Sequence, residues 1–237
     1  MTEAYNWQQL ERAADQPIWI TDDEALAQYC KAWQALPLIA LDTEFIRVDT
    51  FYPVPGLIQI ADDKACYLID PLKIEDYEPM VQLFRDPSVL KVLHAGSEDL
   101  ELFLYMLGDL PTPIFDTQIA AGFLGWGFSM GYQRLVEHAL DVHLEKGETT
   151  SDWLQRPLTS SQEHYAALDV AYLPALCQQQ LAELEERGMA DWASEETALL
   201  LQQVPDRDPD GVTYYQRFSQ AWKLSPERIA ALRDLTA

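Results

Sequence analysis

The sequence has few cysteines and lacks any long apolar run. Its three cysteines, Cys30, Cys66 and Cys177, are far apart and form no CxxC pair. This scatter argues against a disulfide framework or a zinc site, and predicts buried thiols in a reducing cytoplasm. No apolar stretch approaches the roughly 18–20 residues of a membrane helix, and the polar, acidic N-terminus does not resemble a secretory signal. We therefore expect a cytoplasmic protein that does not enter a membrane.

Positive charge is scarce. Sixteen Lys and Arg residues are set against 39 Asp and Glu residues, which gives a formal net charge of −23. By itself this balance counts against a nucleic-acid ligand, because phosphate binders usually carry a basic patch. The chain is otherwise ordinary: 237 residues, 48% hydrophobic and 23% charged. That length suits one large domain, or one domain with a short appendage.

The order of the predicted elements indicates the fold class. Apolar runs predict strands at 38–41, 57–61, 65–69 and 90–93, and helical patterns include 98–107, 117–124 and 160–172. The polar residues 62–64 predict a hairpin turn between the second and third of these strands. Strands therefore come first and in hairpin style, and helices then alternate with strands. This order predicts an α/β fold, with a mixed sheet flanked by helices.

A second, smaller unit is predicted at the C-terminal end. The segment 206–212 contains the residues DRDPDG, which have the composition of a linker. Residues 213–237 include a Ser-Pro pair typical of a helix start, but they have too little apolar surface to form a domain alone. The sequence therefore predicts a main domain over 1–205, a linker over 206–212 and a short helical extension over 213–237.

Two acids follow the first long apolar strand. Asp42 and Glu44 are two residues apart, so a strand places both side chains on the same face. Two carboxylates beside a buried strand are costly unless something cationic compensates them. Exposed residues at a strand end are the alternative interpretation.

Two helices supply further acids. Asp99 is near the start of the helix 98–107, where the helix dipole favours an acid. Glu98 competes for the same role, and periodicity does not choose between them. Tyr165 and Asp169 are four residues apart and are therefore neighbours on one helix face, as many surface pairs also are.

Together these acids predict a metal site. Four hard oxygen ligands without a cysteine suit Mg²⁺ or Mn²⁺ rather than zinc. Four carboxylates carry a charge of −4, which two divalent cations neutralise. Such a pair of ions activates water and stabilises the leaving oxygen in phosphodiester hydrolysis. Bound cations, rather than lysines, would then hold a phosphate, so an acidic protein can still act on nucleic acid.

Three segments resemble the exonuclease motifs of the DEDD superfamily, in the type with tyrosine in the third motif: LIALDTEF, KVLHAGSEDLELF and YAALDVAYL. The segments GLIQ, LIDPL, DTQI and SDWLQRPLT extend the resemblance to the bacterial ribonuclease D family. It covers about residues 18–237. It implies a ribonuclease H-like mixed sheet flanked by helices. It also implies a 3′→5′ exoribonuclease that trims tRNA precursors and other small structured RNAs and releases nucleoside 5′-monophosphates.

The resemblance also implies roles for single residues. Asp42, Glu44, Asp99 and Asp169 match the metal ligands of the family, and Tyr165 matches the residue that orients the attacking water. The implied cofactors are two divalent cations, Mg²⁺ or Mn²⁺. The implied partner is the 3′ end of an RNA, with precursor tRNA as the expected substrate and a monomer as the expected state. Family members carry helical HRDC domains after the nuclease, and residues 213–237 would be the start of one.

Three more side chains near these motifs are candidates. Phe45 follows the acids and could stack on a terminal base or pack in the core. His94 is a candidate substrate contact, although the metal scheme needs no imidazole base and favours a packing or hydrogen-bonding role. Asp116 follows a short strand and is expected to support the site through hydrogen bonds.

Loop residues complete the set of candidates. The resemblance places Arg47, Lys146 and Arg156 near the substrate, although single basic residues are more often solvated surface charges. Lys146 and Arg156 fall in a segment, 145–157, that is predicted to be an exposed loop. Trp153 is the tryptophan that we expect near a functional loop.

Two other functions stay open on the sequence alone. The motifs do not separate RNA from DNA, so a DNA 3′→5′ exonuclease or proofreading-type domain is the alternative within the superfamily. A contact to the 2′-hydroxyl would distinguish the two. A catalytically inactive RNA-binding module is the alternative from another class, and the complete set of acids disfavours it.

Overall fold

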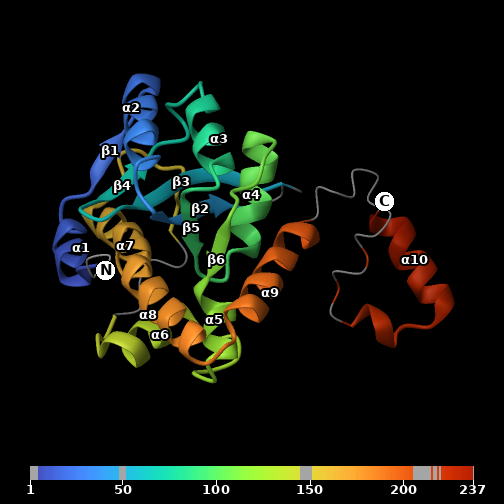
Figure 1. Ribbon diagram of the computed structural model, residues 1–237. Coiled ribbons are helices and arrows are strands. Elements are labelled where there is room, and N and C mark those ends of the chain that lie inside the picture. The colour runs from blue at the N-terminus through green and yellow to red at the C-terminus, as the bar shows by residue number, and fades with distance from the viewer. Residues whose placement is uncertain are drawn as a thin grey trace.

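A mixed sheet organises the main domain (Figure 1). The computed structural model describes residues 5–47, 52–144, 151–204 and 220–236, together with Tyr215 and Phe218. In these residues the strands are β1 (Ile18–Ile20), β2 (Leu38–Ile46), β3 (Val54–Ala61), β4 (Cys66–Ile69), β5 (Leu90–Leu93) and β6 (Ile114–Asp116). They form one six-stranded sheet in the order β1-β4-β3-β2-β5-β6. β3 is antiparallel to β2 and to β4, and the other pairs are parallel.

Helices cover both faces of this sheet. The helices are α1 (Trp7–Ala13), α2 (Asp23–Trp33), α3 (Glu78–Arg85), α4 (Ser97–Leu107), α5 (Thr117–Phe123), α6 (Tyr132–Leu140), α7 (Ser160–Ala171), α8 (Leu173–Glu186), α9 (Ala190–Gln203) and α10 (Pro226–Thr236). The predicted α/β class, with a mixed sheet flanked by helices, is confirmed. None of the described helices is long and apolar enough to cross a membrane.

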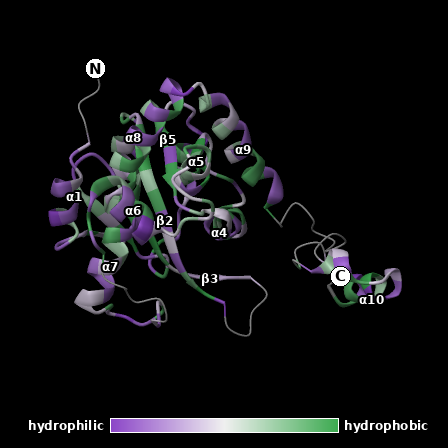
Figure 2. Ribbon diagram, turned by 90° about the horizontal axis from the view of Figure 1, so that it is seen from below, coloured by the Kyte–Doolittle hydropathy of each residue, from purple (hydrophilic) through white to green (hydrophobic). Residues whose placement is uncertain are grey.

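Strand β2 is buried on both faces, which explains its continuous apolar sequence. Ile39 and Leu41 pack into a core with α2, α3 and Phe103 of α4. Leu38 and Ala40 point to the opposite face and pack with α7 and α8. Figure 2 shows the hydrophobic colour along β2 and a largely hydrophilic α1 at the rim. Alternate side chains of β2 thus pack into two different cores, and this fixes the register of the strand.

The break between α7 and α8 has a local cause. α7 begins with a capping box, in which the Thr159 hydroxyl accepts a hydrogen bond from the backbone N–H of Gln162 and the Gln162 side chain accepts one from the backbone N–H of Thr159. α7 ends at Ala171, and Pro174 lies in the first turn of α8. Proline cannot donate an intrahelical hydrogen bond, but it is tolerated in a first turn. The chain therefore starts a new helix.

Strand β2 extends further than its partner β5. The two strands pair only from Leu38 to Ala40, whereas β2 continues beside β3 as far as Ile46. After Leu93 the chain leaves the sheet and enters α4. The acids of β2 therefore lie beside the start of α4 rather than beside a strand. The predicted linker, 206–212, lies outside the described residues.

Candidate active site

The two acids of β2 occupy the part of the strand beyond its pairing with β5. Asp42 is in register with Gln59 of β3, and Glu44 with Leu57. Both acids are half-buried, and their even spacing places them on the same face. Directly after Glu44 the register shifts, which marks a bulge or irregularity in the strand. The strand thus presents two carboxylates side by side toward α7.

The first turn of α4 contributes a third acid. Asp99 is 8% exposed, whereas Glu98 is exposed to solvent. The Thr43 hydroxyl donates a hydrogen bond of 2.5 Å to Oδ1 of Asp99. This bond joins α4 to β2 at Thr43, which lies between Asp42 and Glu44 in the strand. The structure therefore turns Asp99, and not Glu98, toward the strand.

The fourth acid comes from α7, which packs across β2, β3 and β4. Asp169 lies one turn after Tyr165, and the two side chains form a hydrogen bond. The Tyr165 ring packs against a small core that includes Trp153 and Leu57, with 6.3 Å between the ring centres of Tyr165 and Trp153. The ring is thus held by packing while its hydroxyl is directed at Asp169.

Burial raises the pKa values of all four acids, and the charges of nearby carboxylates raise them further. Burial is the larger cause in each case. The pKa of Glu44 is raised to about 8, that of Asp169 to about 7 and that of Asp99 to about 6. The pKa of Asp42 is raised well above its usual value by burial and by the charges of Asp99, Asp169 and Glu44. Three distant segments thus share one electrostatic neighbourhood that favours a cation.

The chemistry of these donors fits a hard divalent cation. All four are carboxylates, the ligands that Mg²⁺ and Mn²⁺ prefer. Within the described part of the chain, no three carboxylate, imidazole or thiol side chains are close enough together to hold an ion by themselves. Magnesium is usually bound by one or two carboxylates and keeps several waters, so it does not need such a cage.

Asp116 supports the turn that carries Asp99. Its Oδ1 accepts hydrogen bonds from the amides of Gln118 and Ile119, at 2.8 and 3.1 Å, and so caps α5. Its Oδ2 accepts a bond of 2.9 Å from the amide of Gly96, the residue before α4. One buried carboxylate thus fixes the starts of two helices, and with them the position of Asp99.

Comparison with known proteins shows which family the chain belongs to. The family model described as "3'-5' exonuclease" matches residues 17–185. The chain belongs to this exonuclease family. Ribonuclease D of Pseudomonas paraeruginosa is 50% identical over 219 residues, which are 92% of this chain and 58% of that protein. This exonuclease-family chain thus spans a little over half the length of that relative.

Solved structures support the fold of this exonuclease-family member. The crystal structure of Escherichia coli RNase D, described as an exoribonuclease involved in structured RNA processing, is 44% identical. It matches with a TM-score of 0.82 over 92% of this chain and 58% of that one, which confirms the ribonuclease H-like fold. Brucella melitensis NrnC with bound Mg²⁺ is 25% identical and matches with a TM-score of 0.70, over 86% of this chain and 98% of that chain.

His94 precedes the turn into α4 and is held by hydrogen bonding. Its Nδ1 lies 2.9 Å from the Thr117 hydroxyl, which itself donates to the Leu93 carbonyl oxygen. Since that hydroxyl proton is used, Nδ1 is the donor and carries the proton. Burial lowers the pKa of the imidazole, and its ring packs beside Tyr132 with 5.5 Å between ring centres. His94 is therefore a neutral, packed side chain.

The candidate substrate contacts from loops have different surroundings. Nη2 of Arg47 lies 3.1 Å from Oε2 of Glu101 in α4, and the guanidinium lies 5.9 Å from the centre of the Phe45 ring. Sequence reasoning missed Glu101, and its only signal was that it is a third acid in the helix of Glu98 and Asp99. Lys146 lies outside the described residues.

Arg156 holds its loop onto the sheet. Its guanidinium donates two hydrogen bonds to the carboxylate of Asp70, at 2.7 and 2.9 Å, and others to the carbonyl oxygens of Gly56 and Trp153. A Cβ on Gly56 would lie 2.7 Å from Cβ of Trp153, so glycine permits this close approach. Arg156 thus places the Trp153 ring that supports Tyr165, and it is committed to structure rather than free for substrate.

Arg156→Ala is expected to lower the free energy of unfolding by about 3 kcal/mol, since it leaves the Asp70 carboxylate without its charged partner in a position where the Asp70 side chain is only 5% exposed. Urea unfolding measures this loss. Arg85→Ala is the control, because it breaks an ion pair with Asp109 in which the Arg85 side chain is 63% exposed. Such a pair contributes at most about 1 kcal/mol. Equal losses in the two variants would contradict the assignment.

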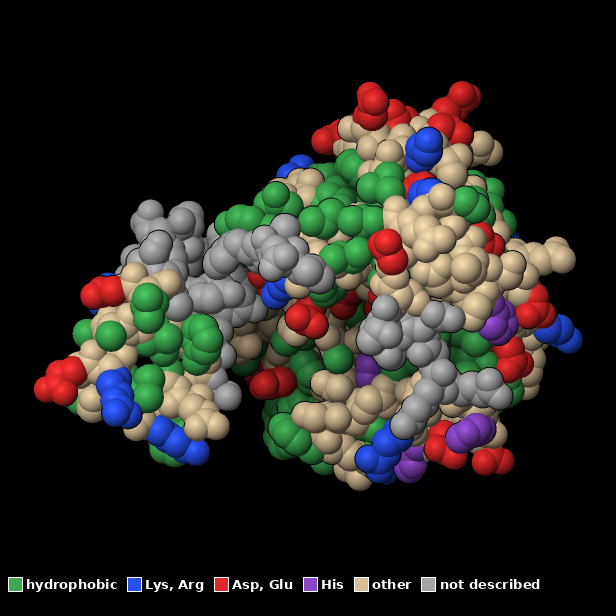
Figure 3. All heavy atoms as spheres, turned by 180° about the vertical axis from the view of Figure 1, so that it is seen from behind, with side chains coloured by type: hydrophobic (Ala, Val, Ile, Leu, Met, Phe, Trp, Pro, Cys, Tyr) green, Lys and Arg blue, Asp and Glu red, His purple; other side chains and the backbone are tan. Residues whose placement is uncertain are grey.

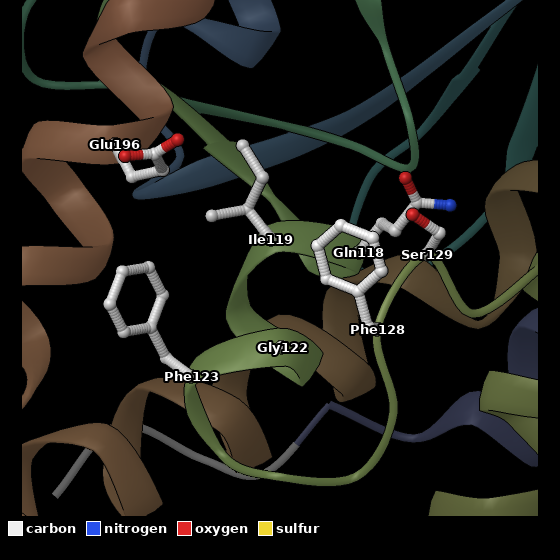
Figure 4. A pocket seen from close by; sticks show the side chains of 7 residues that line it. All are labelled: Gln118, Ile119, Gly122, Phe123, Phe128, Ser129 and Glu196. Atoms are coloured by element: carbon white, nitrogen blue, oxygen red, sulfur yellow. The ribbon is translucent and has the colours of Figure 1, made fainter.

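A cavity of about 360 Å³ lies beside α5 and α9, away from the four acids. Its lining consists of Gln118, Ile119, Gly122, Phe123, Phe128, Ser129 and Glu196 (Figure 4). The lining includes a carboxylate and no basic side chain, which does not suit a phosphate group. This cavity is therefore separate from the site of the acids.

Proposed function

We propose that this chain is a metal-dependent 3′→5′ exoribonuclease that removes nucleotides from RNA one at a time. One observation carries the proposal: acids from β2, α4 and α7 share a buried electrostatic neighbourhood within an exonuclease-family fold. The similarity to RNase D of Escherichia coli, described as acting in structured RNA processing, favours the 3′ ends of tRNA precursors and other small structured RNAs. We further propose that the protein acts as a cytoplasmic monomer.

Hydrolysis joins a water oxygen to the phosphorus of the last phosphodiester. The bond from phosphorus to the 3′ oxygen of the preceding nucleotide breaks, and that oxygen takes up a proton. The products are a nucleoside 5′-monophosphate and an RNA one residue shorter. Asp42, Glu44, Asp99 and Asp169 would hold two Mg²⁺ or Mn²⁺ ions, which supply neutralisation of the phosphate charge and a lower pKa for the attacking water.

The protein's own groups orient the reactants. The Tyr165 hydroxyl is hydrogen-bonded to Asp169, and its pKa is raised by burial and by the neighbouring carboxylates. It therefore stays protonated at neutral pH and acts by orienting the water rather than as a base. Thr43 and Asp116 fix Asp99 through the bonds described above.

This scheme accounts for the acidity of the chain. In the face shown in Figure 3, Asp and Glu side chains are scattered, and the described Lys and Arg side chains form no broad patch. Cations held by the acids would compensate the phosphate charge locally. We propose that Phe45 stacks on a terminal base. We propose Arg47, His94 and Lys146 as further contacts to the substrate, although Arg47 is already paired with Glu101.

Digestion of a matched RNA and DNA tests the function. Both oligonucleotides carry a 5′ label, and each is incubated with Mg²⁺, with Mn²⁺ or with EDTA. We expect stepwise shortening of the RNA from the 3′ end, release of mononucleotides, and no reaction in EDTA. Equal digestion of the DNA would favour the DNA exonuclease instead. Binding of RNA without metal-dependent cleavage would identify an inactive RNA-binding module.

Mn²⁺ is expected to raise the melting temperature more at pH 8 than at pH 5. The folded-state pKa values of Asp99, Asp169 and Glu44 lie at about 6, 7 and 8, above unfolded values of about 4. The stability that these three carboxyl groups contribute when protonated is thus fully present below about pH 4 and is lost as the pH rises through 6 to 8.

A bound cation removes the repulsion among the ionised acids, whereas protons compete with the cation for the carboxylates. At a concentration of about 100 times its Kd, Mn²⁺ should add about 2.7 kcal/mol to the stability. Thermal melting in EDTA and in Mn²⁺ at both pH values measures the effect. A melting temperature indifferent to Mn²⁺ at pH 8 would contradict a cation site.

A further inference from the structure

Strand β3 carries a polar side chain inside the apolar core. Gln59 is fully buried, and among the described residues neither its Oε1 nor its Nε2 has a hydrogen-bond partner. Leaving a buried amide unpaired lowers stability, because its groups lose their hydrogen bonds to water and gain none in the protein. Leucine or methionine would fill the same space without this cost. The position therefore carries a polar group that weakens the resting fold.

The register of the sheet gives Gln59 one polar neighbour. On one side it is paired with Leu68 of β4, and on the other with Asp42 of β2. Residues opposite each other in an antiparallel pair have Cβ atoms about 5 Å apart on the same face. Leu57 and Ala61, which share that face of β3, are apolar. The Gln59 side chain is thus long enough for its amide to reach the Asp42 carboxylate.

Asp42 is the residue of β2 opposite Gln59, and its carboxylate can accept what the amide has to donate. An ionised carboxylate only accepts hydrogen bonds, and a glutamine amide offers two N–H donors. The unpaired amide of Gln59 and the carboxylate of Asp42 are therefore complementary neighbours.

We propose that Gln59 is a positioning residue for Asp42. When the acids are ionised around a cation, the Nε2–H of Gln59 donates to the Asp42 carboxylate and fixes its orientation. The inference rests on the proposed function in taking Asp42 as a ligand. Carboxylates that bind metals are themselves hydrogen-bonded, and loss of such a partner costs about 10–100-fold in metal affinity or activity.

Gln59→Met tests the proposal, because methionine has a similar length and no hydrogen-bonding amide. We expect a melting temperature in EDTA equal to or above that of the wild type. We expect the Kd for Mn²⁺, measured by calorimetry, to rise about 10-fold, and kcat on labelled RNA to fall about 10–100-fold. Gln59→Leu is the second variant, with the same expected results, if the methionine variant does not fold.

Leu68→Met is the matched control. Leu68 faces Gln59 from β4 and is fully buried in the same region, so its substitution reports the effect of repacking alone. A Gln59→Met protein that binds Mn²⁺ as tightly as the wild type would overturn the proposal. Equal weakening in both variants would overturn it as well. Because affinity is measured without turnover, a wild type that binds Mn²⁺ but cleaves nothing would contradict the proposed function and not this inference.

Discussion

Asp42→Asn is expected to abolish cleavage and to leave a folded protein that, without metal, is at least as stable as the wild type. Asparagine has nearly the same shape but removes a charge that is repelled by Asp99, Asp169 and Glu44. Burial and this repulsion raise the pKa of the wild-type carboxylate, so replacing it removes an unfavourable charge from the metal-free fold. Loss of a central electrostatic contact should lower kcat on the order of 10³-fold.

Activity and folding have to be measured together for this variant. Cleavage of labelled RNA in Mn²⁺ gives the rate, and melting in EDTA gives the stability. Glu98→Gln is the control, because Glu98 is an exposed acid next to Asp99. It removes a nearby charge without touching the proposed ligands and should keep nearly full activity. Substantial cleavage by Asp42→Asn would remove Asp42 from the site, and inactivity of Glu98→Gln would show that net charge alone is decisive.

The sequence predicted the class of fold because periodicity is a local property. The apolar run 38–41 and the even spacing of Asp42 and Glu44 locate β2 and the face that carries its two acids. The prediction ended the strand too early, since β2 continues to Ile46. Backbone pairing with β3 carries the strand through polar residues, and hydrophobicity does not report such pairing.

The first residue of β3 was also not predictable from local sequence. The apolar run predicted a strand from residue 57, yet β3 begins at Val54. Gly56 is needed there because Trp153, far along the chain, packs against it. A glycine required by a distant close approach has the same local signature as a glycine in a turn.

The site itself was predictable in part. Residue type and order picked out the acids, but periodicity left Asp99 and Glu98 unresolved. The choice depends on which side of α4 meets β2, as the bond from Thr43 shows. The role of Arg156 was equally hidden, because its partner Asp70 is 86 residues away. Such long-range pairing has no trace in local composition.

Tyr165→Phe is expected to lower kcat on the order of 10²-fold while the affinity for Mn²⁺ and the melting temperature stay near those of the wild type. The substitution removes one oxygen, and the ring can still pack against Trp153. The lost hydroxyl is bonded to Asp169 and stays protonated, because burial and nearby carboxylates raise its pKa. Loss of an orienting contact without loss of a base typically costs about this much.

The pH profile of the same variant distinguishes orientation from packing. The bond from Tyr165 lowers the pKa of Asp169, so its loss should raise that pKa and move the acid limb of kcat to higher pH. Tyr172→Phe is the control, since the Tyr172 hydroxyl instead bonds Glu11 at 2.8 Å and its loss should change neither rate nor profile. A Tyr165→Phe rate within about twofold of wild type, against the expected orientation loss, would reduce Tyr165 to a packing residue. A lower rate with an unshifted acid limb would place the hydroxyl on the water alone, because its bond to Asp169 would then not operate in the active complex.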